Sequence, residues 1–153
     1  MNIWRVYVDG LVKNNQNGPG KAAIGLVITK NENTVLEEGV EIAEPLTNNE
    51  AEWLALLYGV RKVMPMIGGK DEVFFLSDSN LVISQMNGMW RMNKEFFRQA
   101  RQRVLEIMGD ARRQVYFVWV KRDRTKMADA LANGAINHGE EVRSVREIIG
   151  RDL

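Results

Sequence analysis

Several residue types and patterns are absent from this chain, and each absence narrows the class of protein. The 153 residues include no cysteine, which excludes disulfides and thiolate metal sites and is typical of an intracellular protein. No apolar run approaches the roughly 20 residues that span a bilayer, so we expect no membrane contact. The first residues follow a strand pattern and not a basic and then apolar leader, so we expect no signal peptide and a cytoplasmic protein.

Net charge is also nearly absent, at +1, but the charged residues are unevenly distributed. Residues 31–78 hold 3 Lys and Arg against 10 Asp and Glu, whereas residues 91–126 hold 11 Lys and Arg against 4 Asp and Glu. A basic segment folded beside an acidic one can hold a polyanion next to a metal-binding cleft. The alternative is that most of these charges lie on solvated helix faces.

The N-terminal third of the sequence predicts a sheet. Residues 3–8 are mostly β-branched or aromatic, which favours a buried strand, and Asp9 and Gly10 follow it directly. A buried aspartate is costly unless a cation or hydrogen-bond donors meet it. Residues 22–29 and 35–42 predict two more strands, and the short polar turns between them indicate a three-stranded antiparallel meander.

The remainder of the chain alternates helices and strands. Thr47 with Glu50 three residues later has the spacing of a capping box, and the helix that follows is expected to be largely buried. The later predicted elements are strand 73–76, helix 81–86, helix 94–108 capped by Asn93, strand 115–120, charged loop 121–126 and helix 127–137. We therefore predict an α/β fold with a five-stranded mixed sheet, a three-strand antiparallel meander plus two parallel strands, flanked by helices. Residues 1–153 form one domain, with a core over about 1–137 and a helical tail at 139–153.

Four carboxylates stand at the ends of these predicted elements: Asp9, Glu52, Asp78 and Asp129. In a sheet of this kind, the carboxyl ends of neighbouring strands meet at one crevice. Four carboxylates there would repel one another unless divalent cations neutralised them, and ligands that offer only oxygen select Mg²⁺ or Mn²⁺. Taken singly, each acid is equally well explained as a helix cap or a surface charge. Together they predict a metal site.

Four segments resemble the signature blocks of the ribonuclease HI family: YVDG at 7–10, TNNEAE at 47–52, LSDS at 76–79 and ADALAN at 128–133. They occur in the family's order, and the match spans about residues 3–137. The resemblance implies a ribonuclease H-like fold and an RNA/DNA hybrid as substrate. It also implies that Asp9, Glu52, Asp78 and Asp129 are catalytic ligands of two Mg²⁺ ions, or of Mn²⁺, with no small-molecule cofactor. Glu50 competes with Glu52, but its capping-box position and the family's spacing favour Glu52.

The resemblance also implies a set of substrate contacts: Gly10 near an RNA 2′-hydroxyl, Thr47 near a DNA phosphate, and Asn48, Asn49 and Asn80 in the minor groove of the hybrid. Trp90 has the chemistry to stack on a sugar or a base. The alternative for Asn48 and Asn49 is helix capping. For Trp90 it is ordinary packing.

Two features depart from the best-known members of this family. Many carry a histidine in the loop before the last aspartate, whereas the single histidine here, His138, follows Asp129 and is expected to be a helix-end residue. Arg122 occupies the corresponding loop and is predicted to act electrostatically in catalysis, since an arginine is not a base at neutral pH. Arg124 is the rival candidate.

The second departure concerns residues 87–93, a segment too short for the inserted basic helix with which well-known bacterial members hold hybrids. The following helix carries Arg98, Arg101 and Arg103 instead. Weaker hybrid affinity, or reliance on a partner, is the hypothesis that follows.

The predicted function is cleavage of the RNA strand of RNA/DNA hybrids by a monomer, leaving 5′-phosphate and 3′-hydroxyl ends. One alternative keeps the fold and changes the substrate to duplex RNA or DNA. Another is a hybrid-binding module without catalysis. Its signature would be a missing carboxylate, and none of the four is missing.

Overall fold

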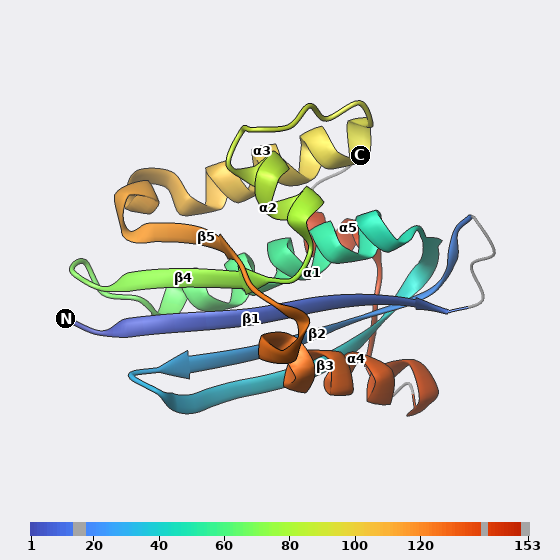
Figure 1. The fold of residues 1–153 in the computed structure, drawn as a ribbon, viewed down its shortest axis with the longest axis horizontal. Coiled ribbons are helices and arrows are strands. Elements are labelled where there is room, and N and C mark those ends of the chain that lie inside the picture. The colour runs from blue at the N-terminus through green and yellow to red at the C-terminus, as the bar shows by residue number, and fades with distance from the viewer. Residues whose placement is uncertain (14–17, 139–140, 151–153) are drawn as a thin grey trace.

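A single mixed sheet organises the computed structural model, which describes residues 1–13, 18–138 and 141–150. Its strand order is β5-β4-β1-β2-β3-β6 (Figure 1). The strands are β1 Ile3–Lys13, β2 Gly20–Lys30, β3 Asn33–Leu46, β4 Glu72–Ser77, β5 Val115–Trp119 and β6 Val142–Arg143.

The first three strands form the predicted antiparallel meander, with β1 against β2 and β2 against β3. Asn31 and Glu32 join β2 to β3 with positive φ angles of 48° and 73°. Two successive residues in the left-handed region give a tight hairpin turn whose twist matches that of the strands. β4 lies parallel to β1, and β5 lies parallel to β4. The predicted α/β class with a mixed sheet is confirmed.

The C-terminal tail differs from its prediction, which was one docked helix beside a five-stranded sheet. Val142–Arg143 form a sixth strand, β6, parallel to β3. The helix α5 covers only Val145–Ile149, because Ser144 and Glu147 close a capping box at its start. A strand of two residues is too short to show an alternating hydrophobic pattern, and it is recognised only by its pairing with β3. The predicted count of five strands was therefore wrong by one. Residues 139–140 and 151–153 of the predicted tail lie outside the described residues.

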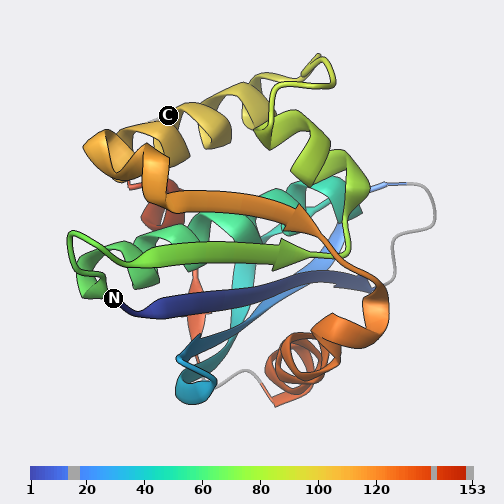
Figure 2. The same ribbon diagram turned by 60° about the vertical axis from the view of Figure 1, so that its left-hand side comes forward.

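Helices cover the two faces of the sheet unequally. The helix α1 (Asn48–Val63) packs on one face, where Val6 and Val8 of β1 lie against its Gly59. The helices α2 (Asn80–Met86), α3 (Glu95–Met108) and α5 lie on the same side as α1, whereas α4 (Lys126–His138) lies alone on the opposite face (Figure 2). Successive strand residues point to opposite faces, so Tyr7 and Asp9 face the α4 side.

The helix α1 is buried on nearly all sides, as predicted. It has the sheet on one side and α3 and α5 on the other, and large side chains such as Trp53, Leu54 and Leu57 are fully buried. The other face is different. Under α4 the contacts are small: Ala23 and Ala132 pack with Ile136.

Main-chain contacts bring α4 very close to the sheet. A Cβ built on Gly25 would lie 1.7 Å from the carbonyl oxygen of Ala128, and one on Gly39 would lie 2.2 Å from that of Leu131. Gly25 pairs with Gly39 across β2 and β3, and Gly25 also pairs with Asp9 of β1. Any side chain on these two glycines would push the helix away, so this row of the sheet fixes where α4 lies.

Three smaller features complete the fold. Lys94, and not Asn93, is the N-cap of α3, and it makes no side-chain capping bond, so the predicted Asn93 cap was wrong. The charged loop at 121–126 contains a short 3-10 helix, η3 (Arg122–Thr125), and the segment at 87–93 contains no helix. Two further 3-10 helices are η1 (Met64–Met66) and η2 (Gly109–Gln114). No helix in the described part of the chain is long and apolar enough to cross a membrane.

Candidate active site

The site lies where β1 and β4 stop pairing. The last parallel pair is Tyr7 with Leu76, but β1 continues to Lys13, so Asp9 and Gly10 extend past the end of the ladder. Glu52 of α1 takes the place of the missing strand partner, because its Oε1 accepts a hydrogen bond from the Gly10 N–H. An opening between the ends of two strands is where open α/β sheets bind their ligands.

Three carboxylates converge at this opening. One oxygen each of Asp9, Glu52 and Asp78 lies within 4.8 Å of the other two. Asp9 is only 6% exposed, and Glu52 and Asp78 are half-buried. The three come from different elements: a strand, a helix and the turn after another strand. The structure therefore brings together three acids that the sequence places far apart.

The N-terminus of α1 determines which glutamate reaches the site. Thr47 is the N-cap, its Oγ1 accepts from the Glu50 N–H at 3.3 Å, and Glu50 Oε1 accepts from the Thr47 N–H at 2.9 Å. This is the predicted capping box, and it uses the Glu50 carboxylate at the helix end. Glu52 is left to reach Gly10. A Cβ on Gly10 would lie 2.5–2.6 Å from Ala51 and Glu52 main-chain atoms, so only glycine allows this close approach.

Asp78 lies in a turn that is itself well ordered by hydrogen bonds. Ser79 caps α2 by accepting from the Val82 N–H at 3.2 Å, and Ser77 Oγ accepts from the Ser79 N–H at 3.0 Å. The Trp119 indole N–H of β5 donates to the Asp78 carbonyl at 3.1 Å. The sequence analysis missed Trp119, because its link to Asp78 depends on β5 lying next to β4.

Asp129 approaches the same carboxylates from the other face of the sheet. It lies in the first turn of α4 and is half-buried. Its carboxyl is a hydrogen-bonding neighbour of Asp9 and contributes to the raised pKa of that group. The contact depends on the Gly25 and Gly39 row, which lets the start of α4 lie directly on β2 and β3.

The electrostatics of the cluster are those of like charges held together. Burial, the neighbouring Asp129 carboxyl and the Asp78 charge together raise the pKa of Asp9 to about 8, with burial as the largest cause. Burial also raises the pKa of Glu52, with the Asp9 charge adding to it and the Gly10 N–H opposing it. Such a cluster is stable in its fully ionised form only when cations neutralise it.

These donors fit a divalent cation. All are carboxylate oxygens, which suit hard ions such as Mg²⁺, Mn²⁺ and Ca²⁺ and not ions that prefer nitrogen or sulfur. Asp9 is so little exposed that water screens the repulsion between the carboxylates only weakly. A bound cation would supply that screening. The arrangement is therefore compatible with divalent metal binding.

The predicted substrate residues Asn48, Asn49, Asn80 and Trp90 do not form part of the carboxylate cluster. Asn48 and Asn49 are exposed in the first turn of α1, and Thr47, not either asparagine, makes the cap. Asn80 is exposed at the start of α2, where its Oδ1 accepts from Ser84 Oγ at 3.2 Å. Trp90 is 48% exposed, which argues against a purely packing role.

The loop that carries Trp90 is anchored from the core. Gln85 accepts from the buried Trp53 indole N–H at 2.7 Å and donates to the Arg91 carbonyl at 3.0 Å. This pair of bonds holds the residue next to Trp90 against α2. Sequence reasoning missed Gln85 because a glutamine inside a short helix has no signal of its own.

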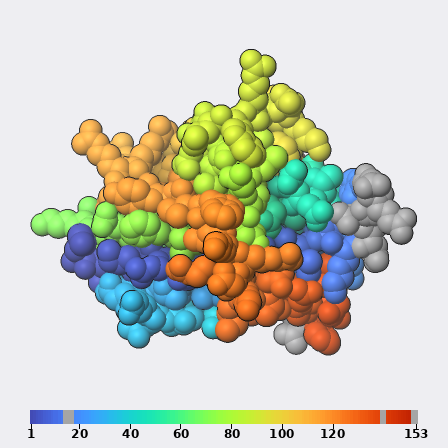
Figure 3. All heavy atoms as spheres, viewed as in Figure 1, coloured from blue at the N-terminus to red at the C-terminus, as the bar shows by residue number. Residues whose placement is uncertain are grey.

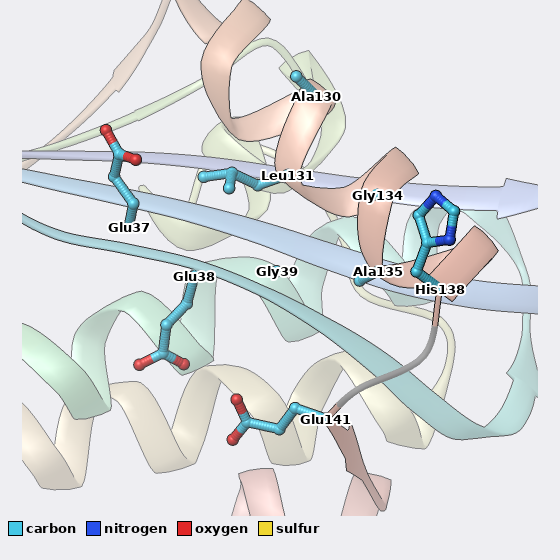
Figure 4. Close-up of a pocket in the computed structure, with 9 residues that line it drawn as sticks. All are labelled: Glu37, Glu38, Gly39, Ala130, Leu131, Gly134, Ala135, His138 and Glu141. Carbon is cyan, nitrogen blue, oxygen red and sulfur yellow. The ribbon is translucent and has the colours of Figure 1, made fainter.

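The two arginine candidates and the histidine lie in different places. Arg122 and Arg124 are exposed in η3, between β5 and α4. His138 is the last residue of α4, the helix-end position predicted for it. It lines a cavity of about 410 Å³ between α4 and β3 (Figure 4). Nine residues of helix separate it from Asp129, roughly 13 Å, so His138 is remote from the carboxylates.

The sheet order, the helices on both faces and the acidic opening together define a protein of the ribonuclease H-like fold class. The family model described as reverse transcriptase-like matches residues 8–135. The chain belongs to this family.

Individual proteins agree with this assignment. Ribonuclease HI of Halobacterium salinarum is 32% identical over 135 residues, which are 86% of this chain and 63% of that protein. The crystal structure of RNase H1 from the same organism matches with a TM-score of 0.77 and 33% identity, over 88% of this chain and 98% of that one. LC11-RNase H1, solved in complex with an RNA/DNA hybrid, matches with a TM-score of 0.80 and 28% identity, over 89% and 98%. The chain spans between 33% and 63% of the length of the curated relatives that it matches, among them the bifunctional protein Rv2228c of Mycobacterium tuberculosis at 33%.

Proposed function

We propose that this protein is an endoribonuclease that hydrolyses the RNA strand of RNA/DNA hybrids and leaves 5′-phosphate and 3′-hydroxyl ends. One observation carries the proposal: Asp9, Glu52 and Asp78 lie within 4.8 Å of one another, and Asp129 adjoins Asp9 from α4. Family membership and the similarity to LC11-RNase H1, a protein solved with a hybrid, support this substrate.

Asp9, Glu52, Asp78 and Asp129 are proposed as the catalytic ligands of two Mg²⁺ ions, for which Mn²⁺ can substitute. When bound, such a pair of ions activates a water and stabilises the leaving oxygen of a phosphodiester. The protein contributes the positions of the carboxylates. Asp9, the most buried, binds at the centre, while the Gly10 N–H orients Glu52 and the capped start of α2 orients Asp78. The raised pKa of Asp9 means that metal binding displaces a proton from the cluster at neutral pH.

Substrate recognition is assigned to the residues around the opening. Asn48 and Asn49 are exposed and are not used in capping, so their amides are available to a minor groove. Asn80 lies at the start of α2, and Trp90 presents half of its surface for stacking. The backbone at Gly10 is proposed to approach an RNA 2′-hydroxyl, and Thr47 is proposed to lie near a phosphate of the DNA strand, at the capped start of α1.

Arg122 is proposed to assist catalysis through its charge. It is exposed in η3, immediately before the helix that carries Asp129. A fixed cation there would attract the scissile phosphate or the product. We further propose that residues 1–153 act as one domain, as a monomer in the cytoplasm without a small-molecule cofactor. Size-exclusion chromatography with light scattering checks the oligomeric state.

The direct test is an assay with a hybrid whose RNA and DNA strands carry different labels. We expect RNA-strand cleavage only when Mg²⁺ or Mn²⁺ is present, and products that a polymerase extends from their 3′-hydroxyl. Duplex RNA and duplex DNA are run in parallel. Preferential cleavage of either duplex would assign a different substrate, and hybrid binding without cleavage at any metal concentration would assign a binding module.

A further inference from the structure

Half of one sheet face has no helix over it. The helix α4 packs on β1, β2 and β3, whereas the helices that pack against β4 and β5 are α1 and α2, on the opposite face. Among the described residues only η3 crosses this side, near the end of β4. In the space-filling view of this face, β1, β4 and β5 reach the surface side by side (Figure 3).

Aromatic and apolar side chains form rows across this bare face. The register aligns Arg5 of β1 with Phe74 of β4 and Tyr116 of β5, and it aligns Val118 with Leu76. Tyr116 is 42% exposed, and its ring stacks on Phe74 with centroids 4.9 Å apart at 18°. A stacked pair with one open ring face leaves a surface on which a further planar group can stack.

Cations without partners lie beside these rings. Arg5 and Arg124 line a cavity of about 280 Å³ together with Tyr7, Thr29 and Glu32. Within the described part of the chain, neither guanidinium group makes a hydrogen bond or an ion pair, although both main chains are hydrogen-bonded. Of the two carboxylates nearby, Glu72 is engaged by the Tyr116 hydroxyl, which donates to it at 3.1 Å, and Glu32 lies in the turn after β2.

We propose that this face binds a single-stranded segment of nucleic acid that continues from the hybrid in the active site. The proposal rests on the proposed function, because its geometry begins at the carboxylates. Asp9 points to this same face two residues after Tyr7, about 7 Å along the strand. A strand leaving the opening over β1 would meet Tyr7 and Arg5 first and the Phe74–Tyr116 pair next.

The chemistry of the face fits a base and a phosphate better than a protein side chain. Open aromatic rings stack on bases of any sequence, and unpaired guanidinium groups bind phosphates or stack on bases. An apolar protein partner would instead bury Arg5 and Arg124 without counter-charges, which is costly. Glu32 lines the same cavity as the two arginines but forms no ion pair with either of them among the described residues, so both guanidinium groups are open to a phosphate.

Binding of a labelled single-stranded oligonucleotide, RNA and DNA in separate arms, tests the face without any cleavage. Fluorescence anisotropy should show about tenfold weaker binding for Tyr116→Ser and for Arg5→Gln, the scale of losing one stacked base. Tyr116→Phe keeps the ring and loses the bond to Glu72, so it should bind like the wild type. Arg112→Gln, an exposed charge change in η2, is the matched control. Equal affinity in all variants, with unchanged thermal melting, overturns the proposal.

Cleavage assays then separate this proposal from the proposed function. A blunt hybrid and the same hybrid with an unpaired tail are compared at limiting substrate. We expect a higher kcat/KM for the tailed hybrid, through a lower KM, and we expect Tyr116→Ser to remove the gain while the blunt hybrid is cut as by wild type. Cleavage of both substrates at one rate refutes the single-strand site alone. No cleavage of the blunt hybrid refutes the proposed function. Capture of a protein with no tail effect would assign the face to a protein partner.

Discussion

The two ends of strands β1 and β4 each bury one aspartate, and the two respond to burial in opposite ways. At the amino ends, Asp71 is 5% exposed, and it accepts hydrogen bonds from Asn2 N–H, Gly68 N–H and the Trp4 indole at 2.8–2.9 Å. At the carboxyl ends, Asp9 is 6% exposed and has carboxylates for neighbours. Hydrogen bonds from Gly68 and Trp4 lower the pKa of Asp71, whereas burial and Asp129 raise that of Asp9 to about 8.

Burial alone therefore does not determine what a carboxylate does. Where donors surround it, the ionised form is favoured and the group ties segments together: Asp71 joins the start of β1, the loop before β4 and the Trp4 ring. Where other acids surround it, the ionised form is disfavoured until a cation arrives. One end of the sheet is a structural joint, and the other is the carboxylate cluster that we propose as the active site.

The largest expected effect is at the acidic end. Asp9→Asn removes the proposed central ligand, and hybrid cleavage should fall by more than about a hundredfold, since even residues that only support a metal ligand cost 10- to 100-fold. In metal-free buffer the same variant should melt at a higher temperature than the wild type, because it removes a repelled carboxylate. Initial-rate assays and thermal melts measure the two effects. A variant that keeps full Mg²⁺-dependent activity would show that Asp9 is not a ligand.

The pH dependence of stability should separate the two ends. Asp9 has a folded pKa of about 8 against an ordinary 3.8, so metal-free protein loses stability as pH rises from about 4 to about 8, on the order of a few kcal/mol. The pKa of Asp71 is lowered, so its contribution is present above about pH 4 and is lost at lower pH.

Metal-free protein should therefore be most stable near pH 4–5. Saturating Mg²⁺ should flatten the alkaline side, since a ligand that binds only the folded state stabilises it. Urea unfolding across pH, with and without Mg²⁺, measures the free energy of unfolding on both the acid and the alkaline side of this maximum. Stability that rises steadily from pH 5 to pH 8 without metal would contradict the electrostatic account of the acidic end.

A smaller effect is expected from the helix that completes the acidic end. Gly25→Ala places a Cβ within 1.7 Å of the Ala128 carbonyl, so α4 must shift, at a cost of about 1–3 kcal/mol, and Asp129 shifts with it. Activity should fall more than stability alone explains. Gly134→Ala, in α4 itself, is the control, because a Cβ at Gly134 meets nothing within 4 Å. This variant should raise the free energy of unfolding by about 0.5–1 kcal/mol. Equal melting temperatures and equal cleavage rates for the two variants would contradict the close packing of α4 on β2.

The smallest expected effect is at the structural joint. Trp4→Phe keeps a ring in the core and removes the donor to Asp71. The melting temperature should fall modestly, the Asp71 pKa should rise, and cleavage per folded molecule should not change. Asp71→Asn should lower the melting temperature further, the opposite sign to Asp9→Asn in metal-free buffer. NMR titration of the Asp71 carboxyl and melting curves check these outcomes.

The acidic end could be anticipated from sequence because its residues lie next to local signals. Asp9 follows a strand pattern and precedes a glycine, and the Thr47 capping box shows which of two glutamates is used at the helix end. The structural joint could not be anticipated. Gly68 is a local donor, but the other two donors to Asp71 lie 67 and 69 positions away, and nothing near Asp71 in the chain indicates them.

Other features were not predicted for the same reason, which is that they depend on residues distant in the sequence. β6 exists because β3 offers an edge to pair with, and α3 begins one residue later than the Asn93 cap predicted, with Lys94 as its N-cap and no side-chain capping bond. Gly25 stands inside a strand pattern, where a glycine signals close approach of something, but the sequence does not say that the carbonyl of Ala128 is what approaches.

The glycine row beneath α4 has a consequence for how this protein can be altered. The helix is seated by main-chain atoms against Gly25 and Gly39, and the buried Ala132 and Ile136 side chains complete the contact. Exposed positions on the outer turns of α4, such as Gly134, can therefore be changed with little effect on Asp129, whereas a side chain at Gly25 or Gly39 would displace the helix and the aspartate with it.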